Sequence, residues 1–169
     1  MFNPQYRILL TSKCFPEDEV VGLGTQLISI VNSIKHYLVP HLWYGADIES
    51  IQKIPTKHDL NNIQLSVIGT DLQFIQYCSE IEQFIWGVFL CVDKNFSSQN
   101  IEGIELETED KSFRSISAKG ILIEIRAFDT TYFGIYTDNI ELITKISEMY
   151  HIEFEKVSNP ASDKVEGVE

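Results

Sequence analysis

The sequence is short of basic residues. Its 169 residues include 13 Lys and Arg against 25 Asp and Glu, which gives a formal net charge of −12. A nucleic acid would be repelled by a chain of this charge, so the composition argues against nucleic-acid binding. The same charge is compatible with a basic protein partner.

Cysteine is also scarce, and long apolar runs are absent. Three widely spaced cysteines, Cys14, Cys78 and Cys91, form no C-x-x-C motif, so neither a disulfide framework nor a zinc knuckle is expected. The first ten residues lack the basic start and apolar run of a secretory signal. The most apolar window, residues 84–92, is far shorter than the roughly 18 residues that a membrane helix needs. We therefore expect a soluble, cytoplasmic protein without a membrane partner.

Motifs for catalysis and for cofactors are missing as well. No two of the four histidines have the i, i+4 spacing of a helical metal site. The segment Gly22-Leu23-Gly24-Thr25 lacks the further residues of a phosphate-binding loop, and the chain has no G-x-S-x-G nucleophile motif. We expect no metal and no cofactor, and a non-catalytic role is favoured over an enzyme.

The hydrophobic patterns predict a single α+β domain over residues 1–157, followed by a flexible tail at 158–169. About six to seven strands and about three helices are expected, in a mixed or mainly antiparallel sheet. Helical spacing covers 27–38, with Thr25 as a candidate N-cap, 71–82, capped by Thr70, and a segment that starts after Asp138. Strand patterns fall at 5–11, 41–48, 64–68, 84–92, 104–108, 120–128, 130–137 and 152–157. The apolar segment 84–92 is expected at the centre of the sheet, covered on both faces.

A polar cluster is predicted on two neighbouring strands. Glu124 and Arg126 are two residues apart, so they share one face of a strand, and Tyr132 and Tyr136 share a face of the next. A cross-strand ion pair on a solvated sheet face would explain the cluster without a function. In a second interpretation it is the floor of a groove in which Arg126 holds an anionic group.

Negative charge is concentrated in the second part of the chain. Residues 1–100 hold ten acids and six bases, a net of −4, whereas residues 101–169 hold fifteen acids and seven bases, a net of −8. On a strand, Glu105, Glu107 and Glu109 would stand on one face about 7 Å apart. This acidic row either meets a basic patch on a partner or is a solvated face that protects an edge strand from aggregation.

Tyr44, Tyr132 and Tyr136 are expected to be exposed, because Tyr132 and Tyr136 are an even number of residues apart on one strand and Tyr44 alternates with Trp43. The leading hypothesis is therefore a protein-binding module, such as an inhibitor, an immunity-type protein or an adaptor, that engages a basic partner through an acidic and aromatic sheet face. The alternative is a small-ligand-binding protein or enzyme. Its pocket would lie between strand 84–92 and the helices and would use Arg126, Glu124, Asp47 and Tyr132. A homodimer closed by the aromatic face is a third possibility.

Overall fold

A computed structural model describes residues 4–16, 23–53, 65–97, 106, 120–129 and 131–157. These residues form one sheet of seven strands in the order β3-β2-β4-β5-β6-β1-β7, and every pairing between neighbours is antiparallel. The α+β prediction is confirmed, and the sheet is antiparallel rather than mixed. The strands are β1 (Tyr6–Thr11), β2 (His41–Gln52), β3 (Ser66–Gly69), β4 (Ile81–Asp93), β5 (Ile121–Phe128), β6 (Tyr132–Thr137) and β7 (Glu155–Lys156).

The apolar segment around residues 84–92 is an interior strand. β4 pairs with β2 on one side and with β5 on the other, and its residues from Gly87 to Val92 are buried. Both faces need apolar side chains, because helices cover one face and a second apolar cluster lies on the other. The near-continuous hydrophobic run is the consequence of this position.

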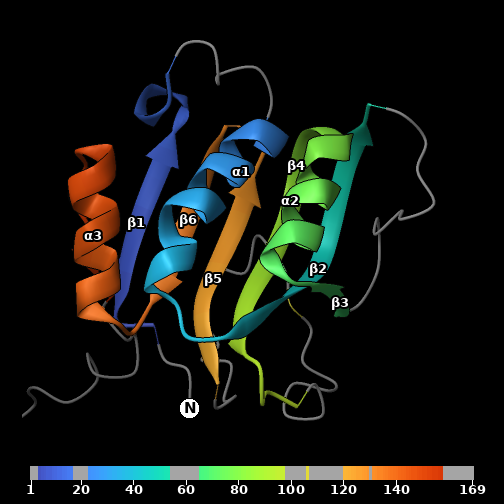
Figure 1. The fold of residues 1–169 in the computed structure, drawn as a ribbon. Coiled ribbons are helices and arrows are strands. Elements are labelled where there is room, and N and C mark those ends of the chain that lie inside the picture. Colours follow the sequence, from blue (N-terminus) through green and yellow to red (C-terminus); the bar gives the residue numbers. More distant parts are fainter. Residues whose placement is uncertain are drawn as a thin grey trace, which may run out of the picture.

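Three helices cover the same face of the sheet (Figure 1). They are α1 (Leu23–Ile34), α2 (Asp71–Glu80) and α3 (Ile140–Tyr150). In Figure 1, α2 lies in front of β4 and β2, α1 lies in front of the middle strands, and α3 flanks β1. The main core is the layer between these helices and the sheet, and it contains fully buried Phe74, Phe84, Phe89, Phe133 and Trp43.

The helix ends are determined by local side-chain bonds. Thr70 precedes α2, and Gln73 Oε1 accepts the Thr70 backbone N–H at 2.9 Å, as in a capping box. Asn139 caps α3, because its Oδ1 accepts the N–H groups of Glu141 and Leu142. Thr25 does not cap α1, since the helix already includes Leu23. α1 ends at Ile34 and continues as a short 3₁₀ turn, η3 (Lys35–Tyr37), before Pro40.

The sheet face without described helices carries the second apolar cluster. Its buried members are Tyr44, Val88, Leu90, Val92 and Ile121. Leu42, Leu65, Phe96 and Leu106 pack against them. We refer to this side as the open face of the sheet, and it is the side to which Glu124 and Arg126 point.

Several predicted boundaries differ from the structure. β2 runs on to Gln52 through register shifts, four residues beyond the strand predicted at 41–48. Asp47 lies in this irregular stretch with a φ of 49°. The predicted strand at 152–157 is reduced to the two residues of β7. The strand predicted at 104–108, apart from Leu106, and the tail at 158–169 lie outside the described residues.

Candidate functional site

The predicted polar cluster forms a row of side chains across four strands of the open face. Glu124 on β5 lies opposite Tyr136 on β6, Tyr136 lies opposite Arg7 on β1, and Arg7 lies opposite Glu155 on β7. Directly opposed residues of an antiparallel sheet point to the same face, so these four side chains are neighbours. We call Glu124, Tyr136, Arg7 and Glu155, together with Arg126, the cross-strand row.

The inner end of the cross-strand row is a buried ion pair. The Arg126 Nε–H donates to Glu124 Oε1, and the two residues are only 6% and 1% exposed. Ile123 and Ile125, which alternate with them along β5, point into the main core. The prediction that Glu124 and Arg126 share a face is confirmed, but the solvated ion pair that the first interpretation required is wrong, since this pair is buried.

Tyr136 connects the buried pair to Arg7. The Arg126 guanidinium carbon lies 5.5 Å from the centre of the Tyr136 ring, within the range of a cation–π contact. The ring also lies across Gly134, where a Cβ atom would be only 2.8 Å from the phenol oxygen. Gly134, opposite Arg126 in the register, therefore makes room for the aromatic ring between the two arginines.

The outer end of the cross-strand row is more exposed. Arg7 Nε donates to Glu155 Oε1 at 2.8 Å, and Arg7 also hydrogen-bonds the Tyr136 side chain. Partial burial lowers the pKa of Arg7, but the bond to Glu155 and the charge of Glu155 raise it more, so the net shift is upward. Burial raises the pKa of the Tyr136 phenol against the opposing effect of Arg126 and Arg7. At neutral pH the row therefore holds two guanidinium cations around a neutral phenol.

The expected exposure of the tyrosines is wrong for two of the three. Tyr44 is 7% exposed and Tyr136 is 3% exposed. Tyr44 does point away from Trp43, as the alternation predicted, but it joins the second apolar cluster and contacts Phe96 edge-on. Tyr132 is half-buried and stacks on Phe128 with 4.8 Å between ring centroids. The alternation of side chains along a strand predicts which residues share a face, but it does not predict that both faces of this sheet bury aromatic rings.

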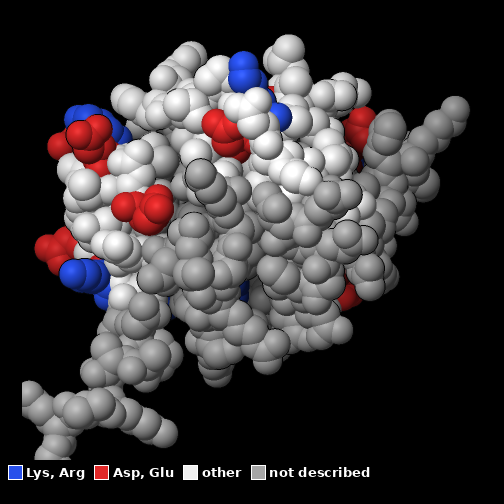
Figure 2. All heavy atoms as spheres, turned by 90° about the horizontal axis from the view of Figure 1, so that it is seen from below, with Lys and Arg blue, Asp and Glu red and all other residues white. Residues whose placement is uncertain are grey.

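Glu105, Glu107 and Glu109 lie outside the described residues. Leu106, which stands between the first two in the sequence, is described, and it packs against the second apolar cluster. Leu106 therefore lies on the open face. In the view of Figure 2 the described acidic side chains are scattered, and several of them lie beside a basic side chain.

Three of the four residues named for the pocket of the alternative hypothesis lie on the open face of the sheet. Arg126, Glu124 and Tyr132 belong to the open face, whereas the space between β4 and the helices is filled by the main core. Asp47 lies on β2, which is separated from β5 by β4. The four side chains therefore do not converge between strand 84–92 and the helices.

One constellation was missed by sequence reasoning. Asp71, in the first turn of α2, accepts hydrogen bonds at its Oδ1 from Trp43 Nε1 and His41 Nε2, both at 2.8 Å. His41 and Asp71 are 30 positions apart in the sequence, so no local spacing rule predicts this contact. The one available signal was Thr70-Asp71, recognised as a helix start but not as a partner for a histidine.

Two of the three cysteines, all of which lie in the described part of the chain, have shifted pKa values. Burial raises the pKa of the Cys78 and Cys91 thiols, and the charge of Asp71 adds to the shift at Cys91. Cys14 is half-buried with its sulfur 4.0 Å from Thr11 Oγ1. No group of three or more His, Cys, Asp or Glu side chains among the described residues is placed to hold a metal ion.

Comparisons with protein families, with curated proteins and with solved structures find no match to this chain. None of the described helices is long and apolar enough to cross a membrane.

Proposed function

We propose that this protein is a non-catalytic binding module of the cytoplasm that recognises a basic protein through its acidic segment, residues 102–110. An inhibitor, an immunity-type protein or an adaptor would act in this way. The segment holds Glu102, Glu105, Glu107, Glu109 and Asp110. A concentration of like charges of this kind accelerates encounter with a partner of opposite charge.

The observation that carries the proposal is the packing of Leu106 on the second apolar cluster. Tyr44, Val88, Leu90 and Val92 belong to the longest paired strands of the sheet, so Leu106, the described residue of this segment, lies against a well-paired part of the sheet. We therefore expect the partner to meet the acids next to Leu106 in the sequence, Glu105 and Glu107. Because Tyr44 and Tyr136 are buried, the proposal assigns recognition to the acids and gives these two tyrosines a supporting role.

The test compares two charge reversals of equal size. Glu105→Lys/Glu107→Lys and Glu82→Lys/Glu153→Lys each change the net charge from −12 to −8, since each Glu→Lys adds two units. Glu82 and Glu153 are exposed and lie at the start of β4 and after α3. The second variant therefore controls for net charge alone.

The wild type and both variants are used to capture proteins from the native cell extract at low and at high salt. We expect a basic protein that is retained at low salt by the wild type and by the Glu82/Glu153 variant. With the purified partner, the Glu105/Glu107 variant should associate at least about tenfold more slowly, with a weaker dependence on salt. Equal association rates for all three proteins, or the absence of any retained basic protein, would overturn the proposal.

A further inference from the structure

Three aromatic residues lie side by side on the open face of the sheet. Trp86 on β4 lies opposite Phe128 on β5, and Phe128 lies opposite Tyr132 on β6. Opposed residues of an antiparallel sheet share a face, and so do residues two apart on one strand, which places all three on the same face as Arg126. The three residues are half-buried, and neither apolar cluster of the described residues includes them. We call Trp86, Phe128 and Tyr132 the aromatic row.

A carboxylate lies at one end of the aromatic row. Glu49 on β2 is opposite Trp86 in the register, so its side chain is next to the indole on the open face. Glu49 is half-buried as well. A second acid, Asp129, is exposed and directly follows Phe128 in the turn between β5 and β6. Negative charge therefore borders the aromatic row at two points.

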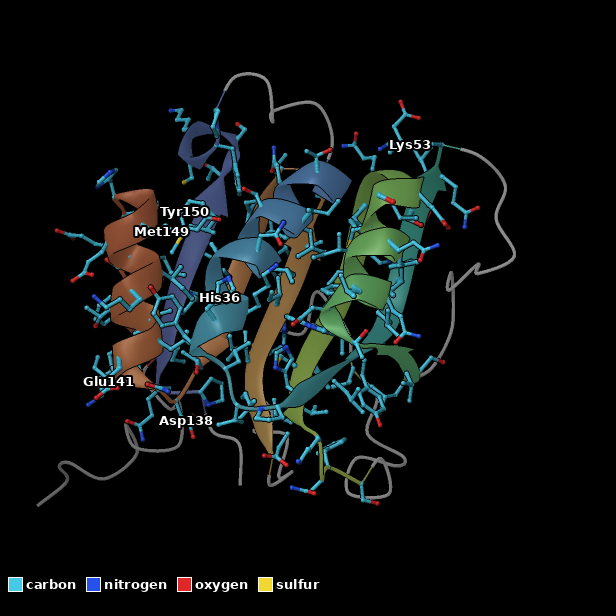
Figure 3. The ribbon with its side chains drawn as sticks, viewed as in Figure 1. His36, Lys53, Asp138, Glu141, Met149 and Tyr150 are labelled. Atoms are coloured by element: carbon cyan, nitrogen blue, oxygen red, sulfur yellow. The ribbon has the colours of Figure 1, made fainter. Side chains whose placement is uncertain are left out.

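The carboxylate of Glu49 has no cation of its own in the described part of the chain. None of the ion pairs there includes Glu49. Lys53, labelled in Figure 3 just beyond the end of β2, donates instead from Nζ to the Ser79 backbone oxygen of α2 at 2.9 Å. Arg126, on the same face as the aromatic row, donates its Nε–H to Glu124. Glu49 is therefore available to a cation from another molecule.

A guanidinium group fits this combination of an indole and a carboxylate. The group is planar, so it can stack on an aromatic face while its N–H groups donate paired hydrogen bonds to a carboxylate. Tryptophan attracts a cation more strongly than the other aromatic residues do. The aliphatic stem of an arginine is apolar and packs well against aromatic rings. An acidic side chain would instead be repelled by Glu49 and Asp129.

We propose that Glu49 and the aromatic row bind an arginine side chain of a basic protein. The guanidinium pairs with Glu49 and stacks on Trp86, and the stem of the arginine lies against Phe128 and Tyr132. None of these residues belongs to the acidic segment, residues 102–110, so the site goes beyond the proposed function. A free arginine derivative tests it, and the outcome does not depend on the capture experiment.

The first test is a ¹⁵N NMR titration of the full chain with Nα-acetyl-arginine amide, whose one charge is the guanidinium. The chain has two tryptophans, and Trp43 is an internal control because it is fully buried and donates its indole N–H to Asp71. We expect the indole signal of Trp86 to shift saturably as the probe rises to about 10 mM, and that of Trp43 to stay in place. The citrulline derivative, which has a neutral urea instead of the guanidinium, should bind at least about fivefold more weakly. An unmoved Trp86 signal, or equal affinity for both probes, would overturn the proposal.

The second test removes the charge of Glu49. Glu49→Gln keeps the length of the side chain, and the arginine derivative should bind this variant at least about fivefold more weakly. Glu153→Gln removes the same charge from an exposed position after α3 and should leave the affinity unchanged. Equal affinities in the two variants would contradict the site, whether both match the wild type or both are weakened.

The third test removes the indole. In the Trp86→Leu protein, saturation transfer from the protein to the arginine derivative should fall to the level of the citrulline derivative, because the stacking surface is gone. Saturation transfer that stays at the wild-type level would refute the role of Trp86. Glu49→Gln decides the matter even where Trp86→Leu impairs folding, since that substitution keeps the size of a half-buried side chain.

Discussion

Glu124 and Arg126 illustrate how burial changes the contribution of a charged pair to the free energy of unfolding. On a solvated sheet face, such a pair would contribute between zero and about 1 kcal/mol. Here both side chains are almost fully buried, between Val88 and Leu90 of β4 and the Tyr136 ring on β6. Desolvation makes each charge costly on its own, so the two depend on each other. Arg7 and Glu155, at the exposed end of the cross-strand row, are expected to contribute far less.

We predict that Arg126→Met lowers the free energy of unfolding by about 3 kcal/mol or more, because it leaves the Glu124 carboxylate buried without its cation. The double variant Glu124→Leu/Arg126→Met should recover most of this loss, since both charges are then replaced by apolar groups beside Val88 and Leu90. Urea unfolding of Arg126→Met, of Glu124→Leu and of the double variant measures the coupling free energy between the two side chains. Additive losses would show that the two side chains act independently.

α1 approaches α2 and β4 closely at Gly24. Gly24, in the first turn of α1, lies against the end of α2 and the start of β4. A Cβ atom at this position would be 2.4 Å from the Ile81 oxygen and 2.6 Å from the Cys78 oxygen. Both are backbone atoms of paired or helical residues, which cannot turn away as a side chain would. The glycine therefore sets how closely α1 approaches α2.

Gly24→Ala should destabilise the protein by about 1–3 kcal/mol, the usual cost of overpacking. Helix propensity alone predicts the opposite sign, because alanine is favoured over glycine by about 1 kcal/mol within a helix. Asn32→Ala, on the exposed side of the same helix, is the matched control and should be close to neutral. Thermal and urea unfolding of both variants give the comparison, and a stabilised Gly24→Ala protein would contradict the close approach.

At the scale of the whole molecule, the net charge of −12 acts on the folded state itself. Like charges held in a compact volume repel one another, and this repulsion weakens the folded state relative to the expanded chain. Salt reduces the range of the interaction from about 30 Å at 0.01 M to about 8 Å at 0.15 M. The excess of acidic residues thus lowers the stability of the folded state.

We therefore predict that the urea midpoint rises when NaCl is increased from about 10 mM to 150 mM. The Glu82→Lys/Glu153→Lys variant, with a net charge of −8, should show a smaller rise. A wild-type urea midpoint that falls with salt would instead indicate that attraction within ion pairs such as Arg7–Glu155 and Lys145–Glu148 outweighs the repulsion between like charges.

The sequence patterns were sufficient to predict helix starts and strand faces, because the interactions that determine these features are local. Thr70 and Gln73 mark the start of α2 by bonding to each other within one turn. The alternation of Ile123 and Ile125 with Glu124 and Arg126 predicts which side chains share a face, because a strand has a period of two. Boundaries were less accurate where tertiary pairing extends an element, as β4 does for the far end of β2.

The candidate site was harder to predict than the fold, because it depends on contacts between residues that are far apart in the sequence. Strand order places Arg7 and Glu155, 148 residues apart in the chain, side by side at the end of the cross-strand row. Tyr136 is buried because it lies between Arg126 and Arg7, and Tyr44 is buried because it packs with β4. Neither neighbourhood can be read from the spacing of aromatic residues along the chain.

By itself the sequence determined the α+β class, the faces of the strands and the net charge, because these follow from composition and from the periods of helix and strand. Only the tertiary structure decided the strand order, the burial of the Glu124–Arg126 pair and the meeting of His41 with Asp71. The physical reason is that the burial and the electrostatic environment of a side chain depend on the residues around it in space. An antiparallel sheet places residues side by side that are far apart in the sequence, so no local sequence pattern predicts these contacts.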